Sequence, residues 1–148
     1  PSYGPEMRGG TANCIAIISD SKISSPILTK FDTVIALNQP SLDKFESAVK
    51  PGGLLIYEAS TIINPPTRTD IDIVPIEAAN EATKLNNSKV MNMIILGAFL
   101  KKKPVITFEN ALDGLKKVLP ERYHKLIPLN KAAMERGMEI AESINTPA

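Results

Sequence analysis

The residues with the most distinctive chemistry lie near the start of the chain, in the segment Ser2–Asn13. Arg8 carries a planar guanidinium group that suits a carboxylate or a phosphate, and Glu6, two positions earlier, can pair with it instead. Adjacent glycines allow a backbone with positive φ to approach a ligand closely. The segment is therefore predicted to bind an anion or, alternatively, to form a structural loop in which Arg8 is tied internally. Its glycines are Gly4, Gly9 and Gly10.

Two amide side chains, Asn38 and Gln39, follow the predicted strand Thr33–Leu37 and precede a predicted helix. Ligands of open parallel sheets bind beyond the carboxyl ends of the strands, so both amides are candidates for ligand contact. The alternative is an ordinary turn between a strand and a helix. The run Glu58–Ala59–Ser60 has the matching position after the next predicted strand, and we interpret it in the same two ways.

Cys14 is the only cysteine of the chain and His124 is the only histidine. One cysteine cannot form an internal disulfide or hold an iron–sulfur cluster, which ordinarily takes four, so we expect Cys14 to be a small buried side chain in a strand. His124 lies in a polar stretch, which favours a surface or interface role. The sequence contains no GxGxxG, GxxxxGK[ST] or GxSxG pattern, so these residues carry no fingerprint of a dinucleotide site, a P-loop or a nucleophile elbow.

The balance of charges argues against two classes of partner. The 148 residues include 17 basic and 16 acidic side chains, and the net charge of +1 creates no field that attracts nucleic acid or an anionic membrane. The longest apolar run, Met93–Leu100, is far shorter than the roughly 20 residues of a membrane span. We therefore expect a cytoplasmic protein that binds neither nucleic acid nor membrane.

Short apolar runs in the first half of the chain predict the strands of a sheet. Thr33–Leu37 and Leu54–Tyr57 are nearly continuous in apolar residues, as strands covered on both faces should be. The predicted helix between them, with Ser41 as its N-cap, ends at Pro51–Gly52–Gly53, which makes a parallel βαβ unit. The other candidate strands are Ala12–Ile18, Ile71–Ile76 (weakened by Pro75) and Ile23–Leu28, which Pro26 makes an edge strand or a loop.

Helices dominate the second half of the chain. The predicted helix Lys89–Leu100 is apolar on nearly all sides, so we expect it to be buried, with Asn92 in an interhelical hydrogen bond. Residues 1–148 are therefore predicted to form a single three-layer α/β/α domain with a largely parallel sheet and a helical C-terminal section. The other predicted helices are Glu77–Leu85, one capped by Thr107 that runs to Leu119, and Leu129–Ile144.

Several segments, taken together and in order, resemble one family. They are similar to the gamma subunit of 2-oxoacid:ferredoxin oxidoreductases, in a form closer to the 2-oxoglutarate and 2-ketoisovalerate enzymes than to the pyruvate enzymes. Several blocks in one order are far more specific than any one alone. The blocks are SYGPEMRGGTANC (Ser2–Cys14), IISD (Ile17–Asp20), ALNQPSLDKF (Ala36–Phe45), KPGGLLIY (Lys50–Tyr57), KVMNMIILGAF (Lys89–Phe99) and HKLIPLN (His124–Asn130).

The resemblance implies a non-redox subunit of an enzyme that decarboxylates a 2-oxoacid, transfers the acyl group to coenzyme A and passes electrons to ferredoxin. Alpha, beta and ferredoxin-like delta subunits would be its partners and would hold thiamine diphosphate, Mg²⁺ and the iron–sulfur clusters. This chain is expected to bind no cofactor, to be inactive alone and to support the substrate and coenzyme A side of the active site. The residues implied there are Tyr3, Gly4, Glu6, Arg8, Gly9, Gly10, Thr11, Asn38 and Gln39.

Members of that family usually begin with a strand and a glycine-rich turn of the GxGGQG type. Neither is found in residues 1–148, so the resemblance predicts a strand and a turn upstream of Pro1. Two other interpretations stay open. One is a free-standing Rossmann-like nucleotide-binding module whose glycine-rich loop precedes Pro1. The other is a pure scaffold subunit that touches no ligand.

Overall fold

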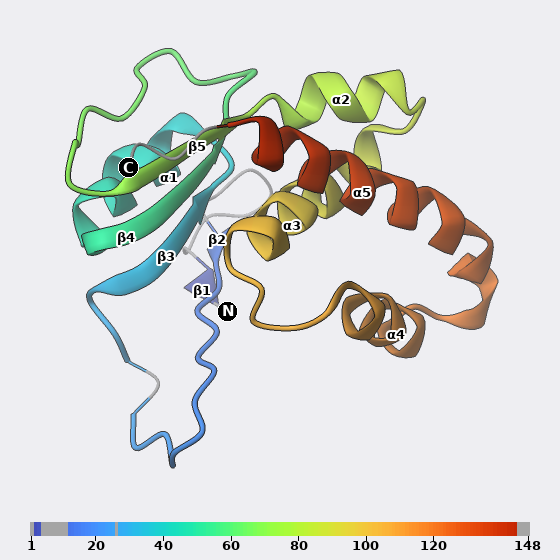
Figure 1. Cartoon of the computed structure of the whole chain (residues 1–148), viewed down its shortest axis with the longest axis horizontal. Coiled ribbons are helices and arrows are strands. Elements are labelled where there is room, and N and C mark those ends of the chain that lie inside the picture. The colour runs from blue at the N-terminus through green and yellow to red at the C-terminus, as the bar shows by residue number, and fades with distance from the viewer. Residues whose placement is uncertain (1, 4–11, 26, 145–148) are drawn as a thin grey trace.

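A three-stranded parallel sheet forms the middle layer of the described part of the chain, which covers residues 2–3, 12–25 and 27–144 of a computed structural model (Figure 1). Its strands are β3 (Phe31–Ala36), β4 (Val49–Glu58) and β5 (Asp72–Ile76), with β4 in the middle. Successive side chains of a strand point to opposite faces. The apolar run of β4 therefore supplies both faces of the sheet.

Helix α1 (Gln39–Phe45) covers one face of this sheet. Its Leu42 is fully buried in a cluster with Val34 of β3 and with Leu55 and Tyr57 of β4. After α1 the chain makes a 3₁₀ turn, Glu46–Ala48, and enters β4, which pairs parallel with β3. The predicted βαβ unit is confirmed.

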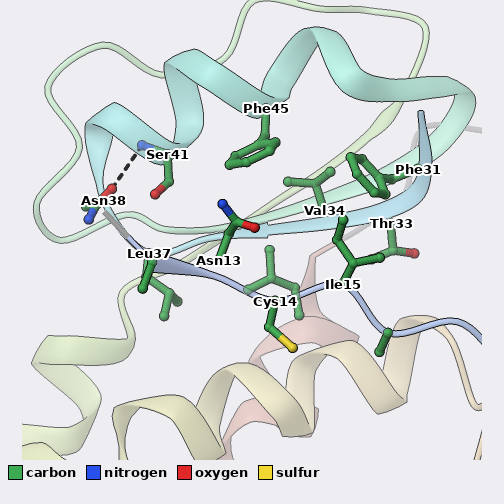
Figure 2. A pocket seen from close by; sticks show the side chains of 13 residues that line it. Asn13, Cys14, Ile15, Phe31, Thr33, Val34, Leu37, Asn38, Ser41 and Phe45 are labelled. Atoms are coloured by element: carbon green, nitrogen blue, oxygen red, sulfur yellow. Dashed lines mark hydrogen bonds between the residues drawn. The ribbon is translucent and has the colours of Figure 1, made fainter. Parts of the chain in front are cut away.

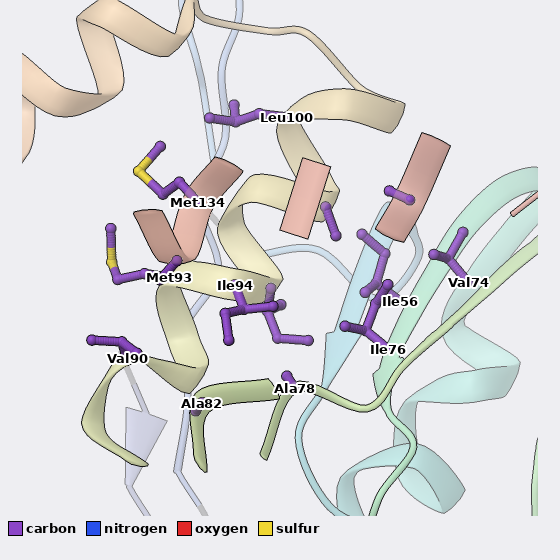
Figure 3. Packing of buried hydrophobic residues seen from close by; sticks show 14 of the residues in the cluster. Ile56, Val74, Ile76, Ala78, Ala82, Val90, Met93, Ile94, Leu100 and Met134 are labelled. Carbon is purple, nitrogen blue, oxygen red and sulfur yellow. The ribbon is translucent and has the colours of Figure 1, made fainter. Parts of the chain in front are cut away.

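Three helices cover the other face: α2 (Ala78–Lys84), α3 (Met91–Lys102) and α5 (Ile127–Ser143) (Figure 1). Figure 3 shows the packing on this side, where Ile56 and Ile76 of the sheet belong to the same buried cluster as Ile94 of α3. The three layers and the helical C-terminal section that the sequence predicts are confirmed.

Helices α3 and α5 touch backbone to backbone where two glycines lie. A Cβ atom built on Gly97 of α3 would overlap the carbonyl oxygen of Met134, and one built on Gly137 of α5 would overlap that of Ile94. No side chain fits at either position, so each glycine is required by the close approach of the neighbouring helix.

The remaining elements are shorter or more exposed. Strands β1 (Ser2–Tyr3) and β2 (Ala12–Asn13) form a separate antiparallel pair, and 3₁₀ turns occupy Ser88–Val90 and Glu121–Leu126. Helix α4 (Phe108–Val118) begins at Thr107, whose Oγ1 accepts a hydrogen bond from the Asn110 N–H at 3.1 Å, as predicted. None of the described helices is both long enough and apolar enough to cross a membrane.

Some local predictions were wrong. The strand predicted over Ala12–Ile18 is reduced to β2, because residues 14–18 have no neighbouring strand in the described structure. The helix does not extend to Pro51–Gly52–Gly53, since α1 ends at Phe45 and these three residues lie inside β4. Gly52 serves there as the residue with positive φ, at 76°.

Two predictions about burial were also wrong. Strand β3 is not covered on both faces, because the helices on the α3 side contact β4 and β5, and they leave Ile35 42% exposed. Asn92 is exposed on the surface of α3 and forms no buried interhelical hydrogen bond. Its neighbours Met93 and Ile94 are buried, which confirms the predicted burial of the helix itself.

The β4–β5 loop, residues 59–71, has no regular secondary structure but is fastened to the elements around it. The Oε1 atom of Glu46 accepts hydrogen bonds from the backbone N–H groups of Thr67 at 3.0 Å and Arg68 at 3.3 Å. The Arg68 guanidinium in turn donates to the carbonyl oxygens of Glu46 at 2.9 Å and Val49 at 2.6 Å. The last part of the loop is therefore held against the end of α1.

Candidate functional site

A pocket of about 450 Å³ lies between strand β3, helix α1 and the extended segment 12–16 (Figure 2). Asn13 points from this segment towards Ser41 and Phe45 of α1, while Cys14 points to the opposite side, as the alternation of an extended chain requires. Most of the residues that line it have apolar side chains. The lining residues are Ala12–Ala16, Phe31, Thr33–Ile35, Leu37, Asn38, Ser41 and Phe45.

The polar end of this pocket is formed by Asn38, at the carboxyl end of β3 and the start of α1. Asn38 is extended, with φ −157°, and its Oδ1 accepts a hydrogen bond from the Ser41 N–H at 2.9 Å. Asn38 is thus the N-cap of α1, and the prediction that Ser41 is the cap was wrong. The Asn38 Nδ2 group has no hydrogen-bond partner among the described residues, so it is free to donate to a ligand.

Gln39 uses both ends of its amide within the protein. Its Oε1 accepts from the backbone N–H groups of Ile63 at 3.0 Å and Asn64 at 2.9 Å. Its Nε2 donates to Asp43 Oδ1 at 2.7 Å and to the carbonyl oxygen of Asn64 at 3.0 Å. In this arrangement Gln39 fastens the β4–β5 loop to α1, and any contact with a ligand would have to replace one of these bonds.

Glu58, at the carboxyl end of β4, is a buried carboxylate with 1% of its surface exposed. It accepts hydrogen bonds from the N–H groups of Ser60, Thr61 and Ala79, at 3.1, 3.2 and 3.1 Å, and from the Thr61 hydroxyl at 3.0 Å. Burial is the largest single influence and opposes ionisation, but the hydrogen bonds together outweigh it, and the pKa of Glu58 lies below its usual value. Of the two interpretations of Glu58–Ala59–Ser60, the geometry favours the structural one.

The structure describes only some of the predicted site residues. Asn38 adjoins the pocket and Gln39 is its neighbour in α1, whereas Gly4, Glu6, Arg8, Gly9, Gly10 and Thr11 lie outside the described residues. The backbone of Tyr3 is paired with Ala12, and that of Ser2 with Asn13, so a short ladder holds together the two ends of this segment. Because Ala12 and Asn13 line the pocket, this ladder adjoins it.

The pocket also contains residues that sequence reasoning did not select. Asn13 and Ser41 bring an amide and a hydroxyl to it from two different elements. Asn13 is the one polar residue in the otherwise apolar run Ala12–Ala16, and this was the available signal for it. For Ser41 there was none, because its position depends on Asn38 being the cap.

Cys14 is exposed and lines the pocket. The prediction of a buried cysteine was therefore wrong, because no neighbouring strand covers this part of the predicted strand in the described structure.

His124 is half-buried, and its Nε2 lies 2.9 Å from the carbonyl oxygen of Leu119 and 3.1 Å from that of Lys116. Both carbonyls are acceptors, so Nε2 carries the proton and satisfies the C-terminal end of α4.

The chemistry available at the pocket is that of neutral hydrogen bonding. Its lining contains no charged side chain, so the described residues supply no cation for an anionic group. Within those same residues, no three side chains of the metal-binding types gather in a group that could hold an ion. The arrangement can therefore position a partly apolar group, and it offers no described general acid, base or nucleophile pair.

Comparison with known proteins defines the class. The chain belongs to the pyruvate ferredoxin/flavodoxin oxidoreductase family, whose model matches residues 1–140. The resemblance inferred from the sequence blocks is confirmed, and so is the fold class. In the solved gamma subunit of the keto/oxoacid ferredoxin oxidoreductase of Geobacter sulfurreducens, the similar part covers 97% of this chain and 78% of that one, at 28% identity with a TM-score of 0.75.

Two relatives show the range of proteins that carry this domain. The ketoisovalerate oxidoreductase subunit VorA of Methanothermobacter thermautotrophicus is 31% identical over 95% of this chain, and the match covers 29% of the relative. The 2-oxoglutarate synthase subunit KorC of Methanocaldococcus jannaschii is 28% identical over 97% of this chain and 76% of its own length. The chain thus spans under a third of the VorA subunits but most of this KorC subunit.

A further structure supports the fold alone. The 2-oxoglutarate:ferredoxin oxidoreductase of Magnetococcus marinus matches with a TM-score of 0.76 but only 19% identity. The match covers 87% of this chain and 23% of that one, so the same domain is also found as one part of a much longer polypeptide.

Proposed function

We propose that this chain is the gamma subunit of a multi-subunit 2-oxoacid:ferredoxin oxidoreductase acting on 2-oxoglutarate or ketoisovalerate. The observation that carries the proposal is the match to a solved gamma subunit over 97% of the chain, in fold and in sequence. The whole enzyme oxidatively decarboxylates the 2-oxoacid, joins its acyl group to coenzyme A, and passes the two electrons released to ferredoxin. This chain's part in that reaction is to bind and enclose, and it is inactive alone.

The segment Ser2–Thr11 is proposed to face the substrate and coenzyme A side of the active site. The β1–β2 ladder that bounds the segment adjoins the pocket at Ala12 and Asn13, which supports this placement. The substrate carboxylate and the phosphates of coenzyme A are anions, and the described pocket lining carries no cation for them. In this proposal Arg8 would supply a guanidinium fork for such an anion, and backbone N–H groups at Gly9 and Gly10 would join the contact.

The cofactors of the reaction are proposed to reside on partner subunits. Thiamine diphosphate, Mg²⁺ and iron–sulfur clusters would be held by alpha, beta and ferredoxin-like delta subunits in the cytoplasm. Residues 1–148 contain the single cysteine Cys14, so they cannot supply the four thiolates that a cluster usually takes. Its own contribution to the redox steps would be the exclusion of water from the substrate side.

We also propose that the apolar length of the pocket receives the N-terminal strand that the resemblance predicts upstream of Pro1. Strand β3 pairs with β4 on one side only, and its other edge faces the pocket. The opposite wall is the extended segment 14–16, whose backbone also lacks a neighbouring strand in the described structure. One extended chain between these walls would satisfy both edges, and a glycine-rich turn after it would lie near Asn38.

The direct test of the function is reconstitution. The companion subunits, which we expect neighbouring genes to encode, are purified with and without this chain. Only the preparation that contains the chain should reduce ferredoxin, and that reduction should require both a 2-oxoacid and coenzyme A. Comparing 2-oxoglutarate with ketoisovalerate identifies the substrate. Equal activity without the chain, or failure of the chain to bind any companion subunit, would refute the proposal.

Two measurements separate the other interpretations. A free-standing nucleotide-binding module would bind NAD or ATP when the purified full-length gene product is tested by calorimetry. A gamma subunit should bind neither nucleotide in that experiment. A pure scaffold subunit would assemble with its partners but would leave the kinetics unchanged when Arg8 is substituted.

A further inference from the structure

Residues 17–25 and 27–28, here called the arm, lie outside the body of the protein between β2 and β3 (Figure 1). In Figure 1 it runs away from the sheet and back, at the blue end of the colour scale. Its described hydrogen bonds are local, between Ser19 and Ser21 at 3.0 and 3.1 Å and from the Ile27 N–H to Ser25 Oγ at 3.3 Å. None of these hydrogen bonds ties the described part of the arm to the body of the protein.

The arm exposes large apolar side chains in close succession. Ile18 is 73% exposed and Ile27 is 81% exposed. Ile23, which lies between them in the sequence, and Leu28, which follows Ile27, are also exposed. Single exposed apolar residues are common on protein surfaces, but several in one projecting segment are typical of an interaction site. The arm carries only two charged side chains, Asp20 and Lys22, whose charges cancel. An anionic membrane or a nucleic acid therefore has no electrostatic attraction for it.

A recess of about 390 Å³ lies at the base of the arm. Ile15, Leu28, Phe31 and Phe45 supply its apolar wall. Lys30 and Lys44 also line it, and neither has an ion-pair partner among the described residues. Lys30 Nζ donates to the Ser47 carbonyl oxygen at 2.7 Å, and Lys44 Nζ lies 5.2 Å from the centroid of the Phe45 ring. The recess thus combines an apolar wall with two cations that no described carboxylate neutralises.

We propose that the arm and this recess form one surface, through which the chain docks on another subunit of the same enzyme. The facing surface is apolar where it covers Ile18, Ile23 and Ile27, and acidic opposite Lys30 and Lys44. An apolar centre with charged groups kept to the rim is the usual composition of a specific protein interface. The inference rests on the proposed function, because it takes the partner to be a companion subunit.

The lengths of the relatives favour a companion subunit over a second copy of this chain. In VorA the matching domain is 29% of the polypeptide, and in the pyruvate-flavodoxin oxidoreductase of Klebsiella pneumoniae it is 14%. In such proteins the domain is joined to the rest of a larger chain, so its natural neighbour is another part of the enzyme. A separate subunit must replace that covalent joining with a docking surface.

The test is co-purification of the companion subunits with chains altered in the arm. Ile18→Ser combined with Ile27→Ser should weaken binding at least about tenfold, because two central apolar contacts are lost. Lys44→Glu should weaken it separately, through repulsion of the acidic rim. The matched control is Ile63→Ser in the β4–β5 loop, where the side chain is 84% exposed and distant in sequence from the arm. The control should bind like wild type.

Each outcome decides between the alternatives. If wild type binds the companion subunits and the arm variant binds equally well, the docking surface is elsewhere and the inference is wrong. If wild type binds no companion subunit, both the proposed function and the inference fail. If wild type self-associates and the arm variant is monomeric, the occupant is a second copy and the inference is overturned. All three isoleucine side chains are exposed, so unfolding curves of these variants should overlay those of wild type.

Discussion

The Arg136 Nε atom of α5 donates a hydrogen bond to Glu81 Oε2 of α2 at 2.8 Å. This pair joins two helices that cover the same face of the sheet but stand far apart in the sequence. Lys84 adds a second cation, 2.8 Å from Glu81 Oε1. The hydrogen bonds from Arg136 and then Lys84 lower the pKa of Glu81 to about 2, against the opposing effect of burial.

This shift gives the first prediction, which concerns acid stability. The stabilisation is complete above the ordinary pKa of glutamate, about 4.5, and is lost as the pH falls through the folded-state value of about 2. Because Arg136 is partly exposed, we expect Glu81→Gln to lower the free energy of unfolding by about 1–2 kcal/mol at pH 7. Urea unfolding between pH 7 and 2 should show the difference from wild type vanishing at low pH. Glu139→Gln, an exposed partner of the same arginine, is the control and should change little.

The second prediction concerns the contact between α3 and α5. Gly137→Ala places a methyl group against the carbonyl oxygen of Ile94, where there is no space, so the helices must separate. We expect a loss of about 2–4 kcal/mol in the free energy of unfolding. Gly114→Ala in the exposed helix α4 meets nothing within 4 Å and should instead add up to about 1 kcal/mol. Similar stabilities for the two variants would contradict the close crossing of α3 and α5.

The third prediction separates the two roles of Asn38. Asn38→Ala removes the acceptor for the Ser41 N–H and should cost about 1 kcal/mol of stability. Asn38→Asp retains that acceptor but loses the Nδ2 donor at the pocket. If Nδ2 contacts a ligand, Asn38→Asp should lower kcat/KM of the assembled enzyme while its melting temperature stays near that of wild type. Unchanged kinetics in a stable Asn38→Asp enzyme would leave Asn38 as a cap alone.

The fourth prediction concerns Arg8. A charge-assisted hydrogen bond contributes roughly 1.5–3 kcal/mol, so Arg8→Ala in the assembled enzyme should lower kcat/KM roughly 10- to 150-fold. Arg8→Lys keeps the charge but loses the planar fork, and should recover only part of the activity. Titrating the 2-oxoacid and coenzyme A separately shows which KM rises and hence which anion Arg8 meets. Full activity of Arg8→Ala with all subunits bound would reject an anion-binding role.

The fifth prediction follows from the open edge of β3. In the full-length gene product, an added strand should cover this edge and slow hydrogen exchange of the amides in Phe31–Leu37 relative to residues 1–148 alone. Amides of β5, on the far side of β4, serve as the internal reference. Equal exchange of Phe31–Leu37 in both proteins would show that nothing pairs with this edge.

The layered architecture could be predicted from the sequence, because it depends on local patterns. Continuous apolar runs such as Leu54–Tyr57 and a helix apolar on nearly all sides, Lys89–Leu100, each indicate burial without knowledge of their neighbours. The failures at Cys14 and Ile35 have the opposite cause. Both stand in apolar runs that are strand-like in themselves, but their burial depends on whether another strand or helix lies against them.

The polar contacts of the site were harder to predict for a related reason. The sequence placed Asn38 after the end of a strand, as the structure has it, yet its capping role depends on where α1 begins, which differed from the prediction. The hydrogen bonds that Gln39 accepts from Ile63 and Asn64, and the one that Arg136 donates to Glu81, join positions that only the folded chain brings together. No local spacing distinguishes these side chains from other surface amides and cations.

The fastening of the β4–β5 loop by Gln39, Glu46 and Glu58 has a consequence for association entropy. A ligand or subunit that docks on this loop meets a backbone whose conformation is already restricted, so little freedom is lost on binding. The arm, with its local hydrogen bonds only, must lose that freedom at the moment of docking. For any partner that did contact this loop, a substitution at Gln39 would therefore lower affinity by raising the disorder of the free protein, without removing a single intermolecular contact.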